Sequence, residues 1–266
     1  HRDFDFTKPA TQLHSTTSIT RNHAMAGFEF YDYPGEFRES AEGDRYARIR
    51  IEELQGGHEV ITGRTEARGM LVGGTFKLKE YPRDDQNREY LITGMEHTIT
   101  SDAFSSASTG EERPLYEGAF MLIPANEVFR SARVSPKPQV TGLQTAIVTG
   151  PSGEEIHTDE YGRVKVQFHW DRDGEYNENS SCWIRVSQNW AGKQWGGIYL
   201  PRIGQEVIVE FLEGDPDRPL VTGRVYNGDL PPPYSLPDEK TKSTLKSNSS
   251  KGGQGFNEIR LEDKKD

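Results

Sequence analysis

The chain has 266 residues and a net charge of −10, from 32 basic and 42 acidic side chains. Residues 1–140 carry −5 and residues 141–230 carry −6, so neither region offers the basic surface that nucleic-acid binding requires. No run approaches the roughly 18 apolar residues of a membrane-spanning helix, and no signal peptide opens the chain. The chain begins at His1 without an initiator methionine, and we expect it to be a fragment of a longer protein.

Hydrophobic residues make up 33% of the chain, and its 27 glycines and 15 prolines favour short strands joined by turns. The single cysteine, Cys182, cannot form an intrachain disulfide. Because it lies between Ser181 and Trp183 at the start of a strand-like run, we expect it to be a small buried side chain.

The first 35 residues are polar and irregular. A helix is predicted over 42–55, where apolar side chains recur on one face. That face consists of Tyr46, Ala47, Ile49, Ile51 and Leu54. The pair Gly56-Gly57 provides a stop. We expect this amphipathic helix to pack on a sheet.

Strands follow, separated by clusters of Gly, Pro, Asp and Asn. They are predicted at Glu59–Gly63, Met70–Leu78, Arg88–Thr100 and Glu117–Pro124. The segment 131–139 contains two prolines and few apolar residues. We therefore place a boundary there and treat residues 1–140 as one β-rich domain with a single amphipathic helix.

Residues 141–230 read as a small closed barrel. Apolar and polar side chains alternate along Arg163–Trp170 and Glu206–Leu212, which is the period of a half-buried strand. Further strands are predicted at 144–149, 183–187, 197–200 and 219–226. Five or six short strands in about 90 residues favour a barrel of the oligonucleotide/oligosaccharide-binding (OB) type.

The tail, 231–266, begins with three prolines. Its Ser/Lys/Gly-rich segment 240–255 is predicted to be a disordered linker, and 256–266 alternates like a strand. Burying Ile259 and Leu261 would stabilise that strand by about 3–6 kcal/mol, whereas ordering its backbone costs about 11–22 kcal/mol. We therefore expect partner strands from further sequence or from other copies of the chain.

The sequence contains only incomplete matches to known catalytic motifs. The run His58-Glu59 is half of a zinc-protease motif, but the second histidine is absent and the segment reads as a strand. The sequence from Gly150 to Gly153 is a turn and not a nucleophile elbow. No phosphate-binding glycine loop follows a strand.

Two pairs of acidic residues invite a calcium or glycosidase interpretation. In Asp171–Gly174 the glycine stands fourth, whereas a calcium loop needs it sixth, so we predict a turn. Asp215 and Asp217 flank Pro216 and also resemble turn residues. Nothing places either carboxyl in the apolar pocket that a general acid needs, and exposed turn carboxylates keep ordinary properties.

Two further groups are weighed against simpler interpretations. His157, His169 and Cys182 do not have the spacing of a four-ligand metal site, and a solvated His169 is the better interpretation. Trp183, Trp190 and Trp195 would suit a stacking platform for bases or sugars, although the acidic charge argues against a phosphate backbone there. Barrel plugging or a subunit interface is the favoured use of these three.

A resemblance spans nearly the whole chain, although only weakly before Phe28. The segment Gly150–Gly228 resembles the OB-fold region of VgrG proteins, the spike proteins of the type VI secretion system. The runs that carry it are 155–171 (EIHTDEYGRVKVQFHWD), 182–186 (CWIRV), 190–192 (WAG), 201–207 (PRIGQEV) and 211–219 (FLEGDPDRP). Upstream, 31–35 (YDYPG) and 41–43 (AEG) resemble the family's phage-hub-like region. Downstream, 257–264 (NEIRLEDK) resembles the start of its β-helical needle.

The resemblance implies a mainly β fold: a hub-like domain over 1–140, an OB barrel over 141–230, and a linker with the start of a trimeric β-helix over 231–266. It also implies a homotrimer that pierces membranes mechanically. Its partners would be an Hcp-type tube protein, a PAAR-type tip protein, the baseplate and effector or adaptor proteins. The protein would assemble in the bacterial cytoplasm and then be secreted or delivered into a target cell.

We therefore predict a structural component and not an enzyme, with no catalytic, cofactor-binding or metal-binding residues. The alternative is an OB-fold binding module that grips a carbohydrate or a cargo protein. Enzymatic activity would require sequence beyond Asp266, and the related phage spike's lysozyme domain has no counterpart here because three prolines and a linker follow the barrel.

Overall fold

A computed structural model describes residues 1–100 and 115–265, and the chain divides into two compact units, His1–Val134 and Ser135–Asp266. The first unit contains β1 (Arg2–Asp3), β2 (Leu13–His14), α1 (Ser40–Gly56), β3 (Ile61–Thr65), β4 (Thr75–Lys77), the 3₁₀ helix η1 (Asp84–Gln86), β5 (Glu89–Ile99) and β6 (Tyr116–Pro124). The second contains β7 (Gln144–Thr149), β8 (Lys165–Phe168), β9 (Arg185–Val186), β10 (Trp190–Ala191), β11 (Gly196–Gly197), β12 (Glu206–Phe211), the 3₁₀ helix η2 (Leu212–Gly214), β13 (Pro219–Val225), β14 (Lys242–Lys246) and β15 (Glu258–Glu262). The predicted domain limits at 140/141 and 230/231 stay predictions.

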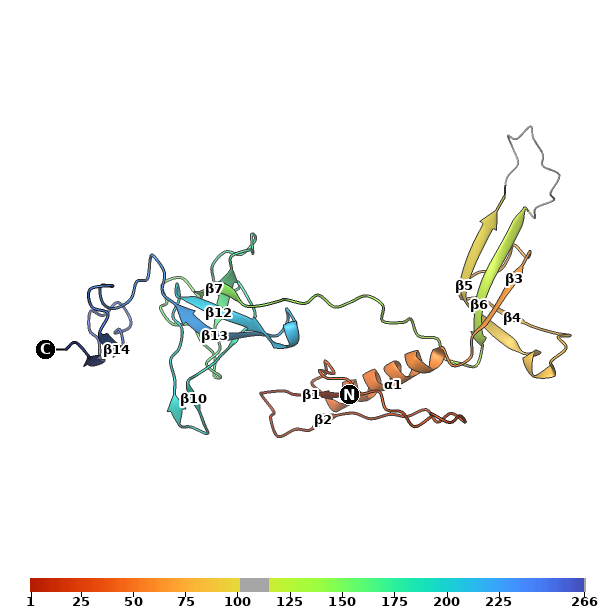
Figure 1. The fold of residues 1–266 in the computed structure, drawn as a ribbon, viewed down its shortest axis with the longest axis horizontal. Helices are drawn as coiled ribbons and strands as arrows, with labels where there is room; N and C mark the ends of the chain where they lie inside the picture. Colours follow the sequence, from red (N-terminus) through yellow and green to blue (C-terminus); the bar gives the residue numbers. More distant parts are fainter. Residues whose placement is uncertain (101–114, 266) are drawn as a thin grey trace, which may run out of the picture. The chain divides into compact units, whose positions relative to one another are not determined.

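The predicted helix is present as α1, and it contacts β2 of the short β1–β2 hairpin (Figure 1). Its buried positions are Gly43, Ala47 and Glu52, whereas Leu54 is 44% exposed. The expected apolar face is therefore wrong in part. The reason is that a two-stranded hairpin covers only a narrow strip of the helix, and Phe37 fills that strip by packing against Gly43, where a Cβ would lie 2.6 Å from the ring.

The rest of the first unit is a four-stranded antiparallel sheet in the order β3-β6-β5-β4. Its core is the buried cluster of Tyr90, Ile92 and Leu122. All four strands were predicted from the sequence, although β4 is shorter than the segment 70–78 expected. The ring of Phe120 lies over Gly63, where a Cβ would approach it to 2.4 Å, so this glycine makes room for core packing.

The second unit contains the predicted barrel. Its sheet has the order β8-β7-β12-β13-β9, antiparallel except for the parallel pair β13–β9. Figure 1 labels β7, β12 and β13 of this sheet. Two backbone hydrogen bonds between Val164 and Ile184, of 2.9 and 2.8 Å, join the ends of the first and last strands. The sheet is thereby closed into a five-stranded barrel of the OB type.

Alternation along β8 and β12 builds the barrel core. Val164, Val166, Val207 and Val209 are fully buried, as the period-2 pattern predicts. Gln167, a polar position of the alternating run Arg163–Trp170, does not follow that pattern and is fully buried beneath the turn that follows β8. The strand 197–200 is also shorter than expected, because β11 consists only of Gly196–Gly197.

The tail forms a two-stranded antiparallel hairpin, in which β14 pairs with β15 from Lys242↔Glu262 to Lys246↔Glu258. This corrects two expectations. The segment 240–255 is not wholly a disordered linker, since it contains β14, and the partner of the last strand comes from this chain. Composition alone missed β14 because its Ser, Thr and Lys side chains are polar, while the pairing is made by the backbone.

Candidate functional site

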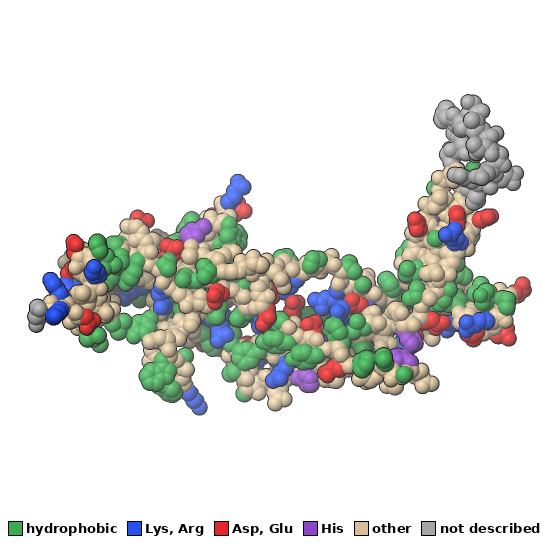
Figure 2. Space-filling model, viewed as in Figure 1, with side chains coloured by type: hydrophobic (Ala, Val, Ile, Leu, Met, Phe, Trp, Pro, Cys, Tyr) green, Lys and Arg blue, Asp and Glu red, His purple; other side chains and the backbone are tan. Residues whose placement is uncertain are grey.

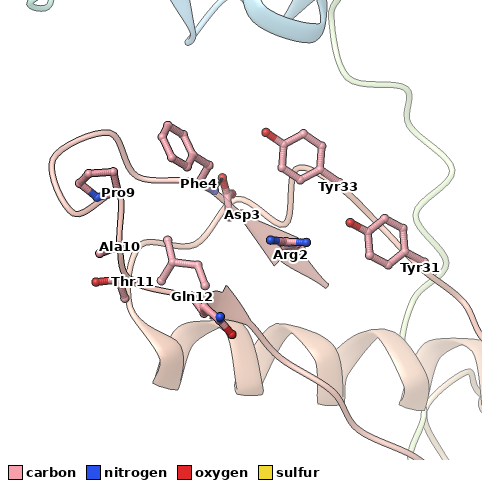
Figure 3. A pocket seen from close by; sticks show the side chains of 10 residues that line it. Arg2, Asp3, Phe4, Pro9, Ala10, Thr11, Gln12, Tyr31 and Tyr33 are labelled. Atoms are coloured by element: carbon pink, nitrogen blue, oxygen red, sulfur yellow. Dashed lines mark hydrogen bonds between the residues drawn. The ribbon is translucent and has the colours of Figure 1, made fainter. Parts of the chain in front are cut away.

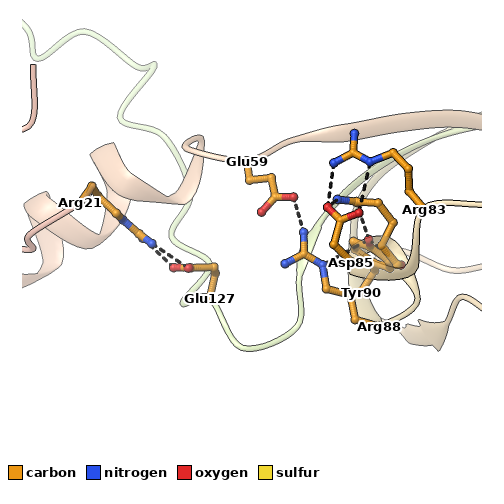
Figure 4. Close-up of polar contacts among 8 residues, drawn as sticks. Arg21, Glu59, Arg83, Asp85, Arg88, Tyr90 and Glu127 are labelled. Atoms are coloured by element: carbon orange, nitrogen blue, oxygen red, sulfur yellow. Dashed lines mark hydrogen bonds and ion pairs between the residues drawn. The ribbon is translucent and has the colours of Figure 1, made fainter. Parts of the chain in front are cut away.

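The two side chains of the half-motif His58-Glu59 point to different partners. The Glu59 carboxylate is bound by the Arg88 guanidinium, and Arg88 also donates to the Tyr90 hydroxyl at 3.3 Å (Figure 4). The His58 ring stacks on that of His23, with centroids 5.6 Å apart. Both side chains are therefore engaged in contacts that fix loops of the first unit.

The other ion pairs in this region are structural in the same way. Arg21 binds Glu127 through two parallel hydrogen bonds of 2.9 and 2.8 Å, and the hydrogen bonding lowers the pKa of Glu127 (Figure 4). Arg83 and Gln86 hydrogen-bond to Asp85 and lower its pKa to about 2. A general acid needs a pKa shifted upward, so neither carboxyl is suited to that role.

The run Asp171–Gly174 is a turn, as predicted. The Asp171 carboxylate accepts the backbone N–H groups of Asp173 and Gly174, both at 3.1 Å. Its oxygen is therefore occupied by the turn that it stabilises.

Asp215 differs from the exposed turn carboxylate that was expected, because only 8% of it is exposed. Burial opposes its ionisation, but hydrogen bonds from Lys137 at 2.8 Å and from the backbone N–H of Asp217 at 2.9 Å outweigh this effect. The pKa of Asp215 is consequently lowered. Asp215 thus holds the turn before β13 through the Asp217 N–H, and it holds the segment that enters the barrel through Lys137. A carboxyl whose pKa is lowered is not suited to act as a general acid.

The histidines and the cysteine of the barrel do not converge. His157 contacts the Trp183 ring at 4.8 Å, whereas His169 accepts or donates a hydrogen bond at 3.0 Å with Thr145. Cys182 is exposed, which corrects the expectation of a buried thiol. Among residues 1–100 and 115–265, no group of three or more His, Cys, Asp and Glu side chains is placed to hold a metal ion.

A pocket of about 610 Å³ lies in the first unit beside the β1–β2 hairpin (Figure 3). Arg2, Phe4, Tyr31 and Tyr33 line it, and Asp3 is the only acidic residue in its lining. Both Asp3 oxygens accept backbone N–H groups, from Phe4 at 2.6 Å and from Phe37 at 3.2 Å. The pocket therefore lacks a second carboxyl, histidine or thiol with which Asp3 could pair for acid–base work.

The three barrel tryptophans fall into two groups. Trp183 is half-buried against His157, with the Lys165 ammonium 5.1 Å from its ring. Trp190 and Trp195 contact each other across the β10–β11 hairpin and are 64% and 59% exposed. They therefore neither plug the barrel nor join Trp183 in a single stacking platform.

The tail hairpin has two dissimilar faces. One face carries the cross-strand pairs Lys242/Glu262 and Lys246/Glu258, and Tyr234 covers it by bonding to Glu258. The other face carries Leu245, Ile259 and Leu261, which are 51%, 70% and 62% exposed. A two-stranded hairpin is at best marginally stable alone, so this apolar face is a candidate for interchain packing.

The loop of the tail hairpin is fixed to the barrel. The Gly252 N–H donates to Glu155 at 2.6 Å, and Lys251 pairs with Glu154 at 2.9 Å. Arg202 donates to the Asn248 carbonyl at 2.7 Å and lies 3.7 Å from Glu155. We call these contacts the tail clamp; it holds the hairpin against one end of the barrel.

Two family models match the chain, one in each unit. Residues 1–103 match the phage tail baseplate hub (GPD), and residues 145–226 match the type VI secretion system/phage-baseplate injector OB domain. None of the helices among the described residues is long and apolar enough to cross a bilayer.

Several proteins similar in sequence to this chain are named as type VI secretion system spike proteins or as VgrG proteins. The chain is 54% identical to type VI secretion system spike protein VgrG1a of Pseudomonas aeruginosa, over 99% of this chain and 41% of that protein. It is 41% identical to actin cross-linking toxin VgrG1 of Vibrio cholerae, over 98% of this chain and 24% of that one. The chain thus spans less than half the length of these relatives.

A solved structure also aligns with the chain. It is that of the Escherichia coli c3393 protein, described as a component of the type VI secretion system that exhibits structural similarity to the T4 bacteriophage tail proteins gp27 and gp5. The alignment has 26% identity and a TM-score of 0.49, and covers 71% of this chain and 44% of the other. Near-complete coverage at 54% identity, with a hub match in one unit and an injector OB match in the other, shows that the chain belongs to the VgrG family of type VI secretion spike proteins.

Proposed function

We propose that this chain is the hub and collar part of a trimeric, membrane-piercing spike with a structural role and no catalysis of its own. The observation that carries the proposal is the exposed apolar face of the tail hairpin. This hairpin follows the barrel in the chain, at the place where a needle would begin. Burying three such side chains between copies would contribute about 1.5–3 kcal/mol each. Interchain pairing would also remove the free strand edges of the hairpin.

In this proposal the three copies form a homotrimer whose hub-like units sit on an Hcp-type tube within the baseplate. A PAAR-type protein caps the needle, and effector or adaptor proteins travel with it. The tube pushes the rigid trimer through the target membrane, so contact with the membrane is mechanical. Assembly takes place in the bacterial cytoplasm, and secretion or delivery follows.

The solution mass of the 266-residue chain, measured by light scattering, tests the proposal. A mass of roughly three times 30.1 kDa would support a trimer built by the hub, barrel and tail hairpin. The double substitution Ile259→Ser with Leu261→Ser should shift that mass toward the monomer. If the chain and a longer protein that extends the tail both stay monomeric, the spike proposal is wrong.

The second candidate, an OB module that grips a carbohydrate or cargo protein, is favoured by one observation, the exposed aromatic pair Trp190 and Trp195. Titration with oligosaccharides while tryptophan fluorescence is recorded tests the carbohydrate arm. An unchanged spectrum at millimolar sugar would remove it.

A further inference from the structure

The β10–β11 hairpin carries a cluster of exposed aromatic and aliphatic side chains. Trp190, Trp195 and Ile198 are 64%, 59% and 70% exposed, and Tyr199 beside them is 42% exposed. In Figure 2 apolar side chains gather at this hairpin, which Figure 1 labels β10. Contiguous apolar side chains on a protein whose barrel core is otherwise closed mark an interaction surface.

The hairpin is held in shape by contacts within itself. The Trp195 ring lies over Gly192, where a Cβ would approach it to 2.4 Å, and the Gly192 N–H donates to the Trp195 carbonyl at 2.9 Å. Gly196 has φ of +133° and lies against the Trp190 carbonyl, a conformation that favours glycine. A preorganised aromatic tip loses little conformational entropy when it binds.

The shape of this tip suits a protein recess better than a sugar. The rings of Trp190 and Trp195 meet at 85° with centroids 5.3 Å apart, so they present one edge and one face in place of a flat platform. Small-molecule sites are concave and enclose their ligands, whereas this group protrudes from a hairpin. Tryptophans of this kind are common anchors at the centre of protein interfaces.

The distribution of charge along the chain indicates which protein the hairpin would bind. The hairpin, residues 190–197, contains Lys193 and no Asp or Glu, so it carries +1 while the rest of the chain carries −11. A second copy of the chain therefore offers an acidic surface to a cationic, apolar hairpin. An anionic bilayer would attract the hairpin too, but it would repel the acidic remainder of the molecule and has no recess to match a rigid tip.

We propose that the β10–β11 hairpin is an intersubunit arm: its tryptophan pair docks into the acidic surface of a neighbouring copy of this chain. The arm rests on the proposed trimer and specifies one of its contacts. Each copy then gives one arm and receives one, as in a closed ring of identical heterologous contacts.

The test combines two measurements on the 266-residue chain. The first is the solution mass across a dilution series, for the wild type, for Trp190→Ser with Trp195→Ser, and for Lys193→Glu. Trp170→Ser is the matched control, because Trp170 is 66% exposed on the same unit but stacks on Phe168. We expect the double variant to need at least about tenfold higher concentration for half-association, Lys193→Glu to weaken association less, and the control to match the wild type.

The second measurement places the photo-crosslinking residue p-benzoylphenylalanine at position 193. Irradiation should give covalent dimers and trimers of the 30.1 kDa chain, and mapped peptides should come from acidic segments of the second unit. Thermal unfolding of the double variant, expected to match the wild type because both side chains are exposed, separates loss of docking from loss of fold.

The outcomes distinguish the arm from the trimer. A wild-type trimer whose mass survives the double substitution, and which gives no crosslink from position 193, overturns the arm and leaves the proposed function standing. A wild-type monomer at every concentration, with no crosslink, overturns the arm, and the mass of the longer protein with an extended tail then decides whether the proposed function falls with it. Binding to vesicles of anionic phospholipid that the double substitution abolishes would overturn the arm in favour of a membrane contact.

Discussion

The amide of Gln167 lies so close to the backbone of Gly174 that a Cβ at position 174 would be 2.0 Å from its nitrogen and oxygen. Gln167 is fully buried, and its Nε2 donates to the Asp171 carbonyl at 3.1 Å. The turn after β8 is thus closed over a polar side chain in the barrel wall. Only glycine at position 174 leaves room for that side chain.

We expect Gly174→Ala to lower the free energy of unfolding by about 1–3 kcal/mol, because the methyl group must displace a fully buried amide and its hydrogen bond to the Asp171 carbonyl. Urea denaturation followed by tryptophan fluorescence measures the change. The matched control is Gly228→Ala, since a Cβ there has no neighbour within 4 Å. Equal stability of the two variants would contradict the packing described.

The Lys137–Asp215 pair should make the stability of the second unit depend on acid. Because the pKa of Asp215 is lowered in the folded protein, its contribution is present above the ordinary value of 3.8 and is lost as the pH falls through the lowered pKa. Asp215→Asn should therefore cost about 1–2 kcal/mol at pH 7, and the cost should shrink below pH 4. Denaturation curves at pH 7 and pH 3 check this; a constant difference between them would refute it.

Two arginine–carboxylate pairs of the first unit should differ in their effect. Arg21 and Glu127 are 19% and 31% exposed and form two parallel bonds, so Glu127→Gln should lower stability by about 1–2 kcal/mol. Arg83 and Asp85 are 69% and 60% exposed. Although the pKa of Asp85 lies at about 2, water screens this pair, so Asp85→Asn should leave the thermal midpoint unchanged. The reverse order of effects would show that pKa, and not burial, governs these pairs.

The tail clamp should control the opening of the tail hairpin. Glu155→Gln weakens the acceptor of the Gly252 N–H, so we expect several-fold faster hydrogen exchange in β14 and β15 at neutral pH, with the barrel core unchanged. Hydrogen bonds with Ser250 and Gly252 lower the pKa of Glu155, so the clamp holds above the ordinary value of 4.5 and is released as the pH falls through the lowered pKa. Glu160→Gln, on the same unit, is the control. Exchange that is unaffected by Glu155→Gln would mean that the hairpin is held by other contacts.

Much of this fold could be predicted from the spacing of apolar residues and from the Gly, Pro, Asp and Asn clusters that separate the strands. The strand at 144–149 was predicted to the residue, and the alternation of Val164, Val166, Val207 and Val209 identified the barrel core. What local pattern could not provide is the contact partner. Leu54 has helical spacing yet stays 44% exposed, because the β1–β2 hairpin is too narrow to cover it.

The site was less predictable for the same reason. Asp215 reads as a surface turn residue until Lys137, 78 positions away, is brought against it. Cys182 lies in an apolar run but is exposed, because sheet pairing begins only at Ile184, two residues later, and does not extend to the thiol. The contact between the exposed rings of Trp190 and Trp195 depends on Gly192 and Gly196, which leave room for the rings and for the turn. These two glycines on either side of Lys193 were the sequence signal from which the hairpin could have been predicted.

The closure of the barrel has a mechanical consequence. The strand β9 is the shortest strand of the barrel: it is joined to β13 by two residue pairs and, through Ile184, to Val164 by a single bridge. The β10–β11 hairpin follows this strand directly in the chain. A torque applied to the hairpin therefore reaches the barrel at the seam with the fewest hydrogen bonds, so this seam, and not the long β12–β13 ladder, sets the load that the barrel bears before it opens.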